Sequence, residues 1–287
     1  MSNGSTQVHC RQIAQTDIDA VVDLLATGFP DRSHDFWRTG LRRLAAHRTP
    51  PELPRFGYLL EVESKPVGVL LVLSSFVDGG PEVRCNVAAW FVAPDYRSLA
   101  PLLAARALRH KQATYLNVSP APHTRPMLDA LGYAPFCKGQ FVCVPALNRS
   151  EPTARVEALA SDSTSSAGLA VFEREVLRDH AALGCLSVVV HLGVRSHPFV
   201  FQRLRWHGLL PFARLIYCRS IDDFIACAGA LGRRLASRGV PLVAIDSNGP
   251  IPGLRGRFRP STPRYFKGTV APRLGDLAYT EFVMFGI

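Results

Sequence analysis

Two side chains in the first half of the chain carry groups that could act in a reaction. His123 follows a predicted strand, in the loop 119–124, and an imidazole can accept or donate a proton near neutral pH. Asn86 lies on a predicted strand, where its amide could orient a substrate or a water molecule. Each has a structural alternative: His123 or Thr124 could cap a short helix, and Asn86 could belong to the core or to the strand ladder. We treat His123 and Asn86 as candidate catalytic residues.

The cysteines do not indicate a metal site. They form no CxxC pair and no Cys/His cluster with the spacing of metal ligands, and several lie in apolar, strand-like runs such as 141–144. Cys85 has no partner base that the sequence reveals, so it is a poor candidate nucleophile. We expect buried thiols and no metal. The seven are Cys10, Cys85, Cys137, Cys143, Cys185, Cys218 and Cys227.

The net charge of +10 favours an anionic ligand. Nucleic acid, an acidic membrane surface and a phosphorylated cofactor would all be attracted to such a surface. The excess is spread along the chain without a basic run or a nucleic-acid-binding motif, so a polyphosphate ligand suffices and no specific nucleic-acid partner is expected. No apolar run reaches the length of a membrane-spanning helix, and the start, residues 1–7, is polar. We therefore expect no membrane insertion and a cytoplasmic location.

The hydrophobic pattern of the first half predicts the order β α α β β β α β α β. Glu63 and Ser64 begin the short turn of a predicted hairpin, and Gly132 could end the last helix of this half. The ranges are strands at 8–13, 58–62, 67–76, 83–92, 114–118 and 140–144, and helices at about 16–25, 33–47, 98–111 and 124–131. This order predicts a mixed, mostly antiparallel central sheet flanked by helices.

The second half repeats part of this pattern. Residues 148–168 are polar and serine-rich, which is typical of a linker or an exposed loop, and they place a domain boundary near residue 150. Beyond it we expect strands at 186–192, 199–204, 212–218, 241–245 and 279–285, a helix at 221–237, and a basic loop at 249–273. The prediction is therefore two similar α/β domains in tandem, 1–150 and 151–287.

Residues 92–97, Val-Ala-Pro-Asp-Tyr-Arg, resemble the phrase with which a strand ends and a helix begins in the GNAT superfamily of acyl-CoA-dependent N-acyltransferases. Residues 131–133, Leu-Gly-Tyr, resemble a later phrase of the same family. The resemblance covers about residues 8–145. The second half resembles a degenerate GNAT-like domain without its own cofactor site, because Asp222 and Asp223 stand where phosphate would bind.

The resemblance implies a site for acyl-CoA, acetyl or longer, at the start of the helix after this phrase. In the family, main-chain amides there hold the pyrophosphate of CoA. The implied binding residues are Val92, Arg97, Ser98, Leu99, Ala100 and Leu102. Ala100 and Leu102 replace two glycines of the family phrase, and the side chain of Leu102 could crowd the phosphate. The basic loop 249–273 could contact an anionic acceptor or a phosphate of CoA, or be a solvated loop.

The resemblance also implies direct attack of an amine on the thioester, with a base and an acid to move protons. The family's usual acid, a tyrosine four residues before the glycine of the later phrase, is Leu128 here. Tyr133 reads as a core aromatic, which leaves His123 as the nearest titratable candidate. We predict transfer of an acyl group to an amine of an unknown acceptor. The alternatives are a non-catalytic acyl-CoA or metabolite-binding protein and a nucleic-acid-binding protein, and an oligomer is compatible with each.

Overall fold

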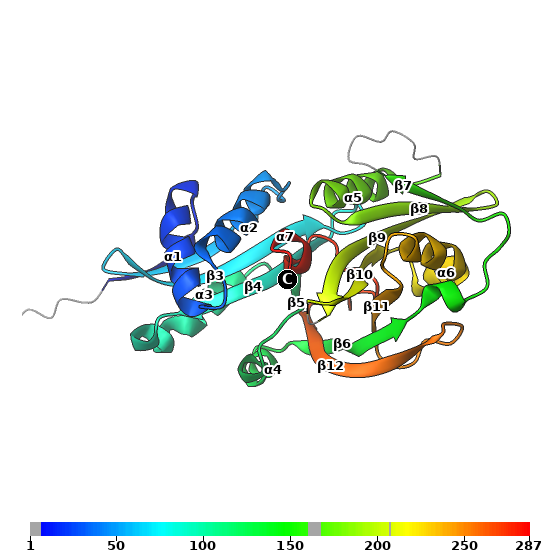
Figure 1. Cartoon of the computed structure of the whole chain (residues 1–287). Helices are drawn as coiled ribbons and strands as arrows, with labels where there is room; N and C mark the ends of the chain where they lie inside the picture. The colour runs from blue at the N-terminus through cyan, green and yellow to red at the C-terminus, as the bar shows by residue number, and fades with distance from the viewer. Residues whose placement is uncertain (1–6, 160–167, 207) are drawn as a thin grey trace, which may run out of the picture. The chain divides into compact units, whose positions relative to one another are not determined.

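The computed structural model of the chain describes residues 7–159, 168–206 and 208–287. It divides into two compact units (Figure 1). The first unit contains residues 1–118, 267–270 and 279–287, and the second contains 119–266 and 271–278. Residues 1–6 of the polar start and residues 160–167 of the predicted linker lie outside the described part. The division into domains at 1–150 and 151–287 stays a prediction, because the compact units follow other bounds.

The first unit is a sheet with helices on both faces. Strand β3 lies in the middle and is buried from Val67 to Ser75, since helix α1 packs on one face and α3 on the other. The strand order is β1-β2-β3-β4-β5, with antiparallel pairs up to β4 and a parallel pair β4–β5. The elements are β1 (Val8–Gln12), α1 (Ile18–Gly28), α2 (His34–Ala46), β2 (Gly57–Val62), β3 (Lys65–Phe76), β4 (Val83–Val92), α3 (Ala100–Ala107), β5 (Thr114–Asn117) and α7 (Glu281–Met284).

Local sequence explains several of these bounds. The hydroxyl of Ser33 accepts a hydrogen bond from the N–H of Phe36 at 3.2 Å and caps α2. Glu63 and Ser64 adopt φ of 51° and 63°, so that Val62 pairs with Lys65 across a two-residue turn. The predicted hairpin is therefore confirmed.

The second unit repeats the order of the first. Strand β7, helix α5, strands β8, β9 and β10, helix α6 and strand β11 follow one another, again with antiparallel pairs up to β10 and a parallel pair β10–β11. The elements are α4 (Arg125–Ala130), β6 (Ala134–Cys143), β7 (Arg155–Leu159), α5 (Val171–Ala182), β8 (Leu186–Leu192), β9 (Arg195–Trp206), β10 (Leu210–Cys218), α6 (Ile221–Ala236), β11 (Leu242–Ser247) and β12 (Gly256–Lys267). The strand order is β12-β6-β11-β10-β9-β8-β7.

Four segments of the second half differ from the sequence-based expectation. The predicted linker contains β7, which pairs with β8, and α5 was not expected. The predicted loop 249–273 contains β12, which pairs with β6 and carries register shifts between Pro260 and Arg264 and between Arg264 and Tyr265. The predicted strand 279–285 is instead the short helix α7. Its four residues are all buried, and three of them, Phe282, Val283 and Met284, are apolar; such a short run does not distinguish a strand from a buried helix.

The C-terminal segment packs inside the first unit, against α2. The ring of Phe285 lies 5.6 Å from that of Trp37, and it occupies the space that a Cβ atom on Gly40 would need. Arg43 also donates a hydrogen bond to the carbonyl oxygen of Met284 at 3.2 Å. The last residues of the chain therefore complete the core of its first unit.

Candidate active site

The end of strand β4 is the first feature of the candidate site. Strands β4 and β5 pair from Arg84 with Thr114 to Asn86 with Leu116, and among the described residues the pairing goes no further. Beyond this point β4 has a β-bulge at Ala89, whose φ of 41° is left-handed and rare for a residue with a side chain. Strand β4 then continues to Val92 with one edge free of β5.

The free edge presents main-chain groups. The N–H of Ala93 donates to the carbonyl oxygen of Val67 on β3 at 2.8 Å. Successive residues of a strand direct their main-chain groups to opposite edges, so those of Val92 and of Trp90 point away from β3. Within the described part of the chain, no other segment forms a hydrogen bond with these groups.

A helical segment follows this edge directly and brings together the predicted cofactor-binding residues. The 3-10 helix η2 (Pro94–Leu99) leads into α3 without an intervening loop, so Arg97, Ser98 and Leu99 lie in one helical turn. This explains why the predicted helix 98–111 is shorter than expected: its first turn is 3-10, and α3 ends at Ala107. The N–H of Ala100 donates to the carbonyl oxygen of Arg97, and Pro101 has no N–H. Neither position can therefore supply an amide to an anion.

The side chains of this segment face the solvent. Arg97 and Ser98 are exposed, and Leu102 is 46% exposed whereas its neighbour Leu103 is fully buried. A ligand at this turn would therefore meet the side chains of Arg97 and Ser98.

Asn86 lies on β4 at the last pair with β5. Its neighbour Cys85 faces the side of the sheet that carries Arg106 of α3, so Asn86 faces the opposite side, which α1 covers. Asn86 is 1% exposed, and neither its Oδ1 nor its Nδ2 has a hydrogen-bond partner among the residues that the structure describes. A buried amide without partners carries a free-energy cost of about 1–3 kcal/mol for each unmade bond, which makes it a candidate contact for a ligand or a water molecule.

The second unit contains a corresponding edge, and its own chain fills it. Strand β10 pairs with β11 up to Arg214 and then has a register shift between Leu215 and Tyr217. Past the shift, the carbonyl oxygen of Ile216 accepts from Leu277 N–H at 2.7 Å, and Cys218 N–H donates to the carbonyl oxygen of Gly275 at 2.8 Å. An extended segment of amides thus occupies the edge of β10 that corresponds to the free edge of β4.

The comparisons with known proteins bear on this arrangement. No protein-family model and no curated protein sequence matches the chain. Among solved structures, a GCN5-related N-acetyltransferase from Anabaena variabilis is 12% identical, with a TM-score of 0.61 over 91% of this chain and 72% of that one. Another from Kribbella flavida is 14% identical, with a TM-score of 0.59 over 93% of this chain and 72% of that one. The fold is that of the GCN5-related N-acetyltransferases.

His123 and Leu128 belong to the part of the GNAT fold that lies in the second unit. His123 is exposed in the short 3-10 helix η3 (Pro122–Thr124), and the hydroxyl of Thr124 donates to the carbonyl oxygen of Ala121 at 2.8 Å. The structure therefore does not bring His123 and Asn86 together within one unit. Leu128 is buried at 2% exposure and can donate no proton. Tyr133 is buried at 6%, as expected for a core aromatic.

Two residues of the first unit near Asn86 were not singled out from the sequence. The Nε2 atom of His47 lies 3.1 Å from the carbonyl oxygen of Ser74, one residue along β3 from Leu73, the strand partner of Asn86. The ring of Tyr279 contacts that of His47, with 4.8 Å between the centroids and 37° between the ring planes. His47 follows a helix and Tyr279 begins a predicted strand, so no sequence signal linked them. They add an imidazole and a phenol to this side of the unit.

On the opposite side of β4, the thiol of Cys85 is not a reactive group. Burial raises the pKa of Cys85 to about 11, and the thiol lies 3.5 Å from the hydroxyl of Ser74. A thiol with this pKa is protonated at neutral pH, which agrees with a structural role. The described residues contain no group of His, Cys, Asp and Glu side chains that could hold a metal ion. They also contain no helix long and apolar enough to cross a membrane.

Proposed function

We propose that the chain transfers an acyl group from acyl-CoA to an amine, with the CoA held by its first unit. The observation that carries this proposal is the free edge of β4 at Trp90 and Val92, which leads directly into the helical segment with Arg97. The pantetheine arm of CoA is extended and has two amide groups. An extended arm of this kind can hydrogen-bond to a free strand edge as an added strand does. Residues 275–277 fill the corresponding edge of β10 in this way.

The pyrophosphate of CoA would then lie at the turn formed by η2 and α3. The helix dipole favours an anion there, and the guanidinium of Arg97 would add charge-assisted hydrogen bonds. Leu102 stands where the family phrase has a glycine. Its side chain is 46% exposed, so it does not fill the core at this turn and leaves the arrangement possible. Val92 contributes through its main chain, whereas Arg97 and Ser98 contribute through side chains.

The proposed reaction is attack of an amine nitrogen on the thioester carbonyl carbon. The C–N bond forms, the C–S bond breaks, the nitrogen loses one proton and the CoA sulfur gains one. Asn86 would use its unpartnered amide to orient the thioester or a water molecule. His123 remains the proposed proton carrier, because an imidazole can both accept and donate a proton.

A second candidate function is acyl-CoA or metabolite binding without catalysis. The observation that favours it is Leu128, a buried apolar side chain at the position where the family resemblance implies a proton donor. Both functions require the same binding site. Only turnover distinguishes them.

Calorimetric titration with acetyl-CoA and with a longer acyl-CoA tests the shared requirement. We expect one molecule bound per chain, because the chain itself fills the edge of β10. Failure of every acyl-CoA to bind at millimolar concentration would overturn both functions. Release of free CoA thiol is then measured over a panel of amines. Turnover that His123→Ala reduces at least tenfold supports the enzyme, and binding without thiol release from any amine supports the second candidate.

A further inference from the structure

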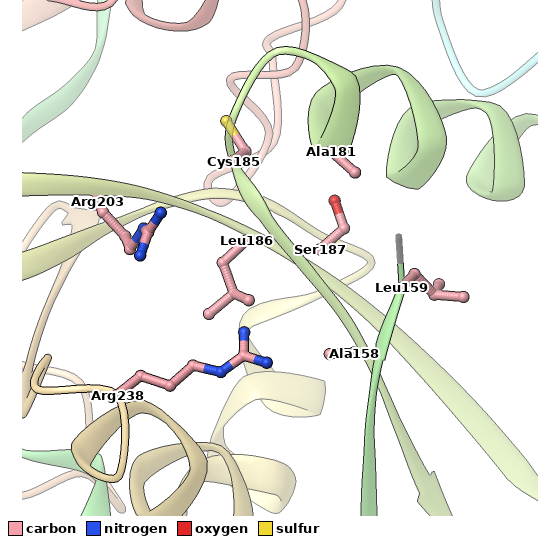
Figure 2. A pocket seen from close by; sticks show the side chains of 8 residues that line it. All are labelled: Ala158, Leu159, Ala181, Cys185, Leu186, Ser187, Arg203 and Arg238. Carbon is pink, nitrogen blue, oxygen red and sulfur yellow. The ribbon is translucent and has the colours of Figure 1, made fainter. Parts of the chain in front are cut away.

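A separate cavity of about 450 Å³ opens in the second unit (Figure 2). Its apolar wall comes from the end of β7, the end of α5 and the start of β8, with the side chains Ala158, Leu159, Ala181 and Leu186. The lining also includes Cys185, Ser187 and two guanidinium groups: Arg203 reaches the cavity from β9 and Arg238 from the turn after α6. A volume of this size accommodates a small organic molecule.

The positive charge at this cavity is not balanced by the protein. Arg234 lies one turn before Arg238, on the last turn of α6. In the part of the chain that the structure describes, none of Arg203, Arg234 and Arg238 forms an ion pair with a carboxylate, and the buried Nε of Arg234 has no hydrogen-bond partner. Burial and the charges of Arg234 and Arg203 together lower the pKa of Arg238 from its ordinary value. Like charges that lie close together without a counter-ion repel one another, and a bound anion would relieve this repulsion.

Capping of helix α6 does not explain these arginines. Cationic side chains often gather at a helix C-terminus because its last carbonyl groups lack partners. Here the carbonyl oxygens of Arg233, Leu235 and Ala236 accept from the main-chain N–H groups of residues 237 to 240. The hydroxyl of Ser237 donates to the carbonyl oxygen of Arg234 at 2.9 Å. The end of the helix is satisfied without any guanidinium.

We propose that this cavity binds a small organic anion, a phosphate or carboxylate joined to an apolar group, with Arg203 and Arg238 on the anion and Leu186 against the apolar part. Guanidinium groups match planar and tetrahedral oxyanions by paired N–H donors. The apolar wall explains why a bare inorganic ion would be the weaker ligand. The site consists entirely of residues of the second unit and does not depend on the acyl-CoA site proposed above.

Calorimetric titration of the full chain with phenyl phosphate, benzoate and inorganic phosphate tests the proposal. We expect phenyl phosphate or benzoate to bind and inorganic phosphate to bind more weakly. Arg203→Gln and Arg238→Gln should each weaken the organic anion roughly tenfold, as for a lost charge-assisted contact. Leu186→Ala should weaken the binding of phenyl phosphate and leave the affinity for inorganic phosphate unchanged. The stronger of phenyl phosphate and benzoate identifies the oxyanion.

Two arginines elsewhere serve as matched controls. Arg195→Gln removes one exposed positive charge from the other end of β9, and Arg42→Gln removes one from α2. Both should bind the anions as the parent chain does. Thermal unfolding checks the fold, and neither cavity variant should be less stable than the parent, since each relieves repulsion between like charges. The proposal fails if no probe binds at millimolar concentration, or if the control variants weaken binding as much as Arg203→Gln and Arg238→Gln.

Discussion

Replacing Asn86 by leucine should make the protein more stable and less active. Asn86 is 1% exposed, and in the described part of the chain neither the oxygen nor the nitrogen of its amide has a hydrogen-bond partner. Each unmade hydrogen bond of a buried polar group costs about 1–3 kcal/mol, and leucine has a similar volume without polar atoms. Part of this gain is lost to imperfect packing of the branched side chain. We therefore expect Asn86→Leu to raise the free energy of unfolding by about 1–3 kcal/mol.

Urea and thermal unfolding without ligand measure the first half of this prediction. For a domain of this size, about 1 kcal/mol corresponds to roughly 2–4 °C in the melting temperature. The second half concerns turnover with acyl-CoA and an amine. If the amide orients the thioester or a water molecule, kcat/KM should fall at least tenfold, which corresponds to about 1.4 kcal/mol of transition-state stabilisation.

Asn248→Leu is the matched control. Its side-chain oxygen accepts from the N–H of Lys138 at 2.9 Å, and its nitrogen donates to the carbonyl oxygen of Phe136 at 3.0 Å. The same substitution there removes two made bonds and should lower the free energy of unfolding by about 1–2 kcal/mol. If Asn86→Leu also lowers stability, its amide is satisfied in the native protein and the reasoning is refuted. If turnover is unchanged, Asn86 has no part in the reaction.

Three further predictions concern the cofactor segment and pH. Val92→Pro removes an N–H that points away from β3 and should weaken the binding of CoA measured by calorimetry. Val92→Ala keeps that N–H and should bind CoA as the parent does. Equal affinities of the two variants would exclude the strand-edge contact. Arg97→Ala should weaken the binding of CoA roughly tenfold, and Leu102→Gly should tighten this binding despite a helix cost of about 1 kcal/mol. If neither variant changes the affinity, the pyrophosphate binds elsewhere. Burial raises the pKa of Cys85 to about 11 from an ordinary value of 9.0, so its contribution to stability is complete below pH 9 and is lost between pH 9 and 11. Urea unfolding over this pH range should therefore show that the free energy of unfolding falls less for Cys85→Ala than for the parent, by up to about 1.4 kcal/mol per pH unit. Identical slopes of this free energy against pH would contradict a buried, protonated thiol.

The sequence by itself determined most elements of the first half and the segment proposed to hold the cofactor. The helical spacing of the apolar residues of α1, the serine cap of α2 and the hairpin turn at Glu63 and Ser64 are local signals, and each depends on residues a few positions apart. The residues after β4 were placed by their resemblance to a family phrase. The structure then gathers Arg97, Ser98 and Leu99 in one helical turn, since they are consecutive.

The tertiary structure alone decided the features that depend on partners distant in the chain. A segment rich in Gly, Pro and Arg reads as a loop, yet β12 is a strand because β6, more than a hundred residues earlier, supplies its hydrogen bonds. The free edge of β4 follows from the bulge at Ala89 and from where the ladder with β5 stops, and the edge of β10 is closed by residues 275–277. Asn86 became a stronger candidate only when its buried amide was found without partners. Hydrogen-bond partners and burial are properties of the folded chain, and local periodicity contains no information about which distant residues will supply them.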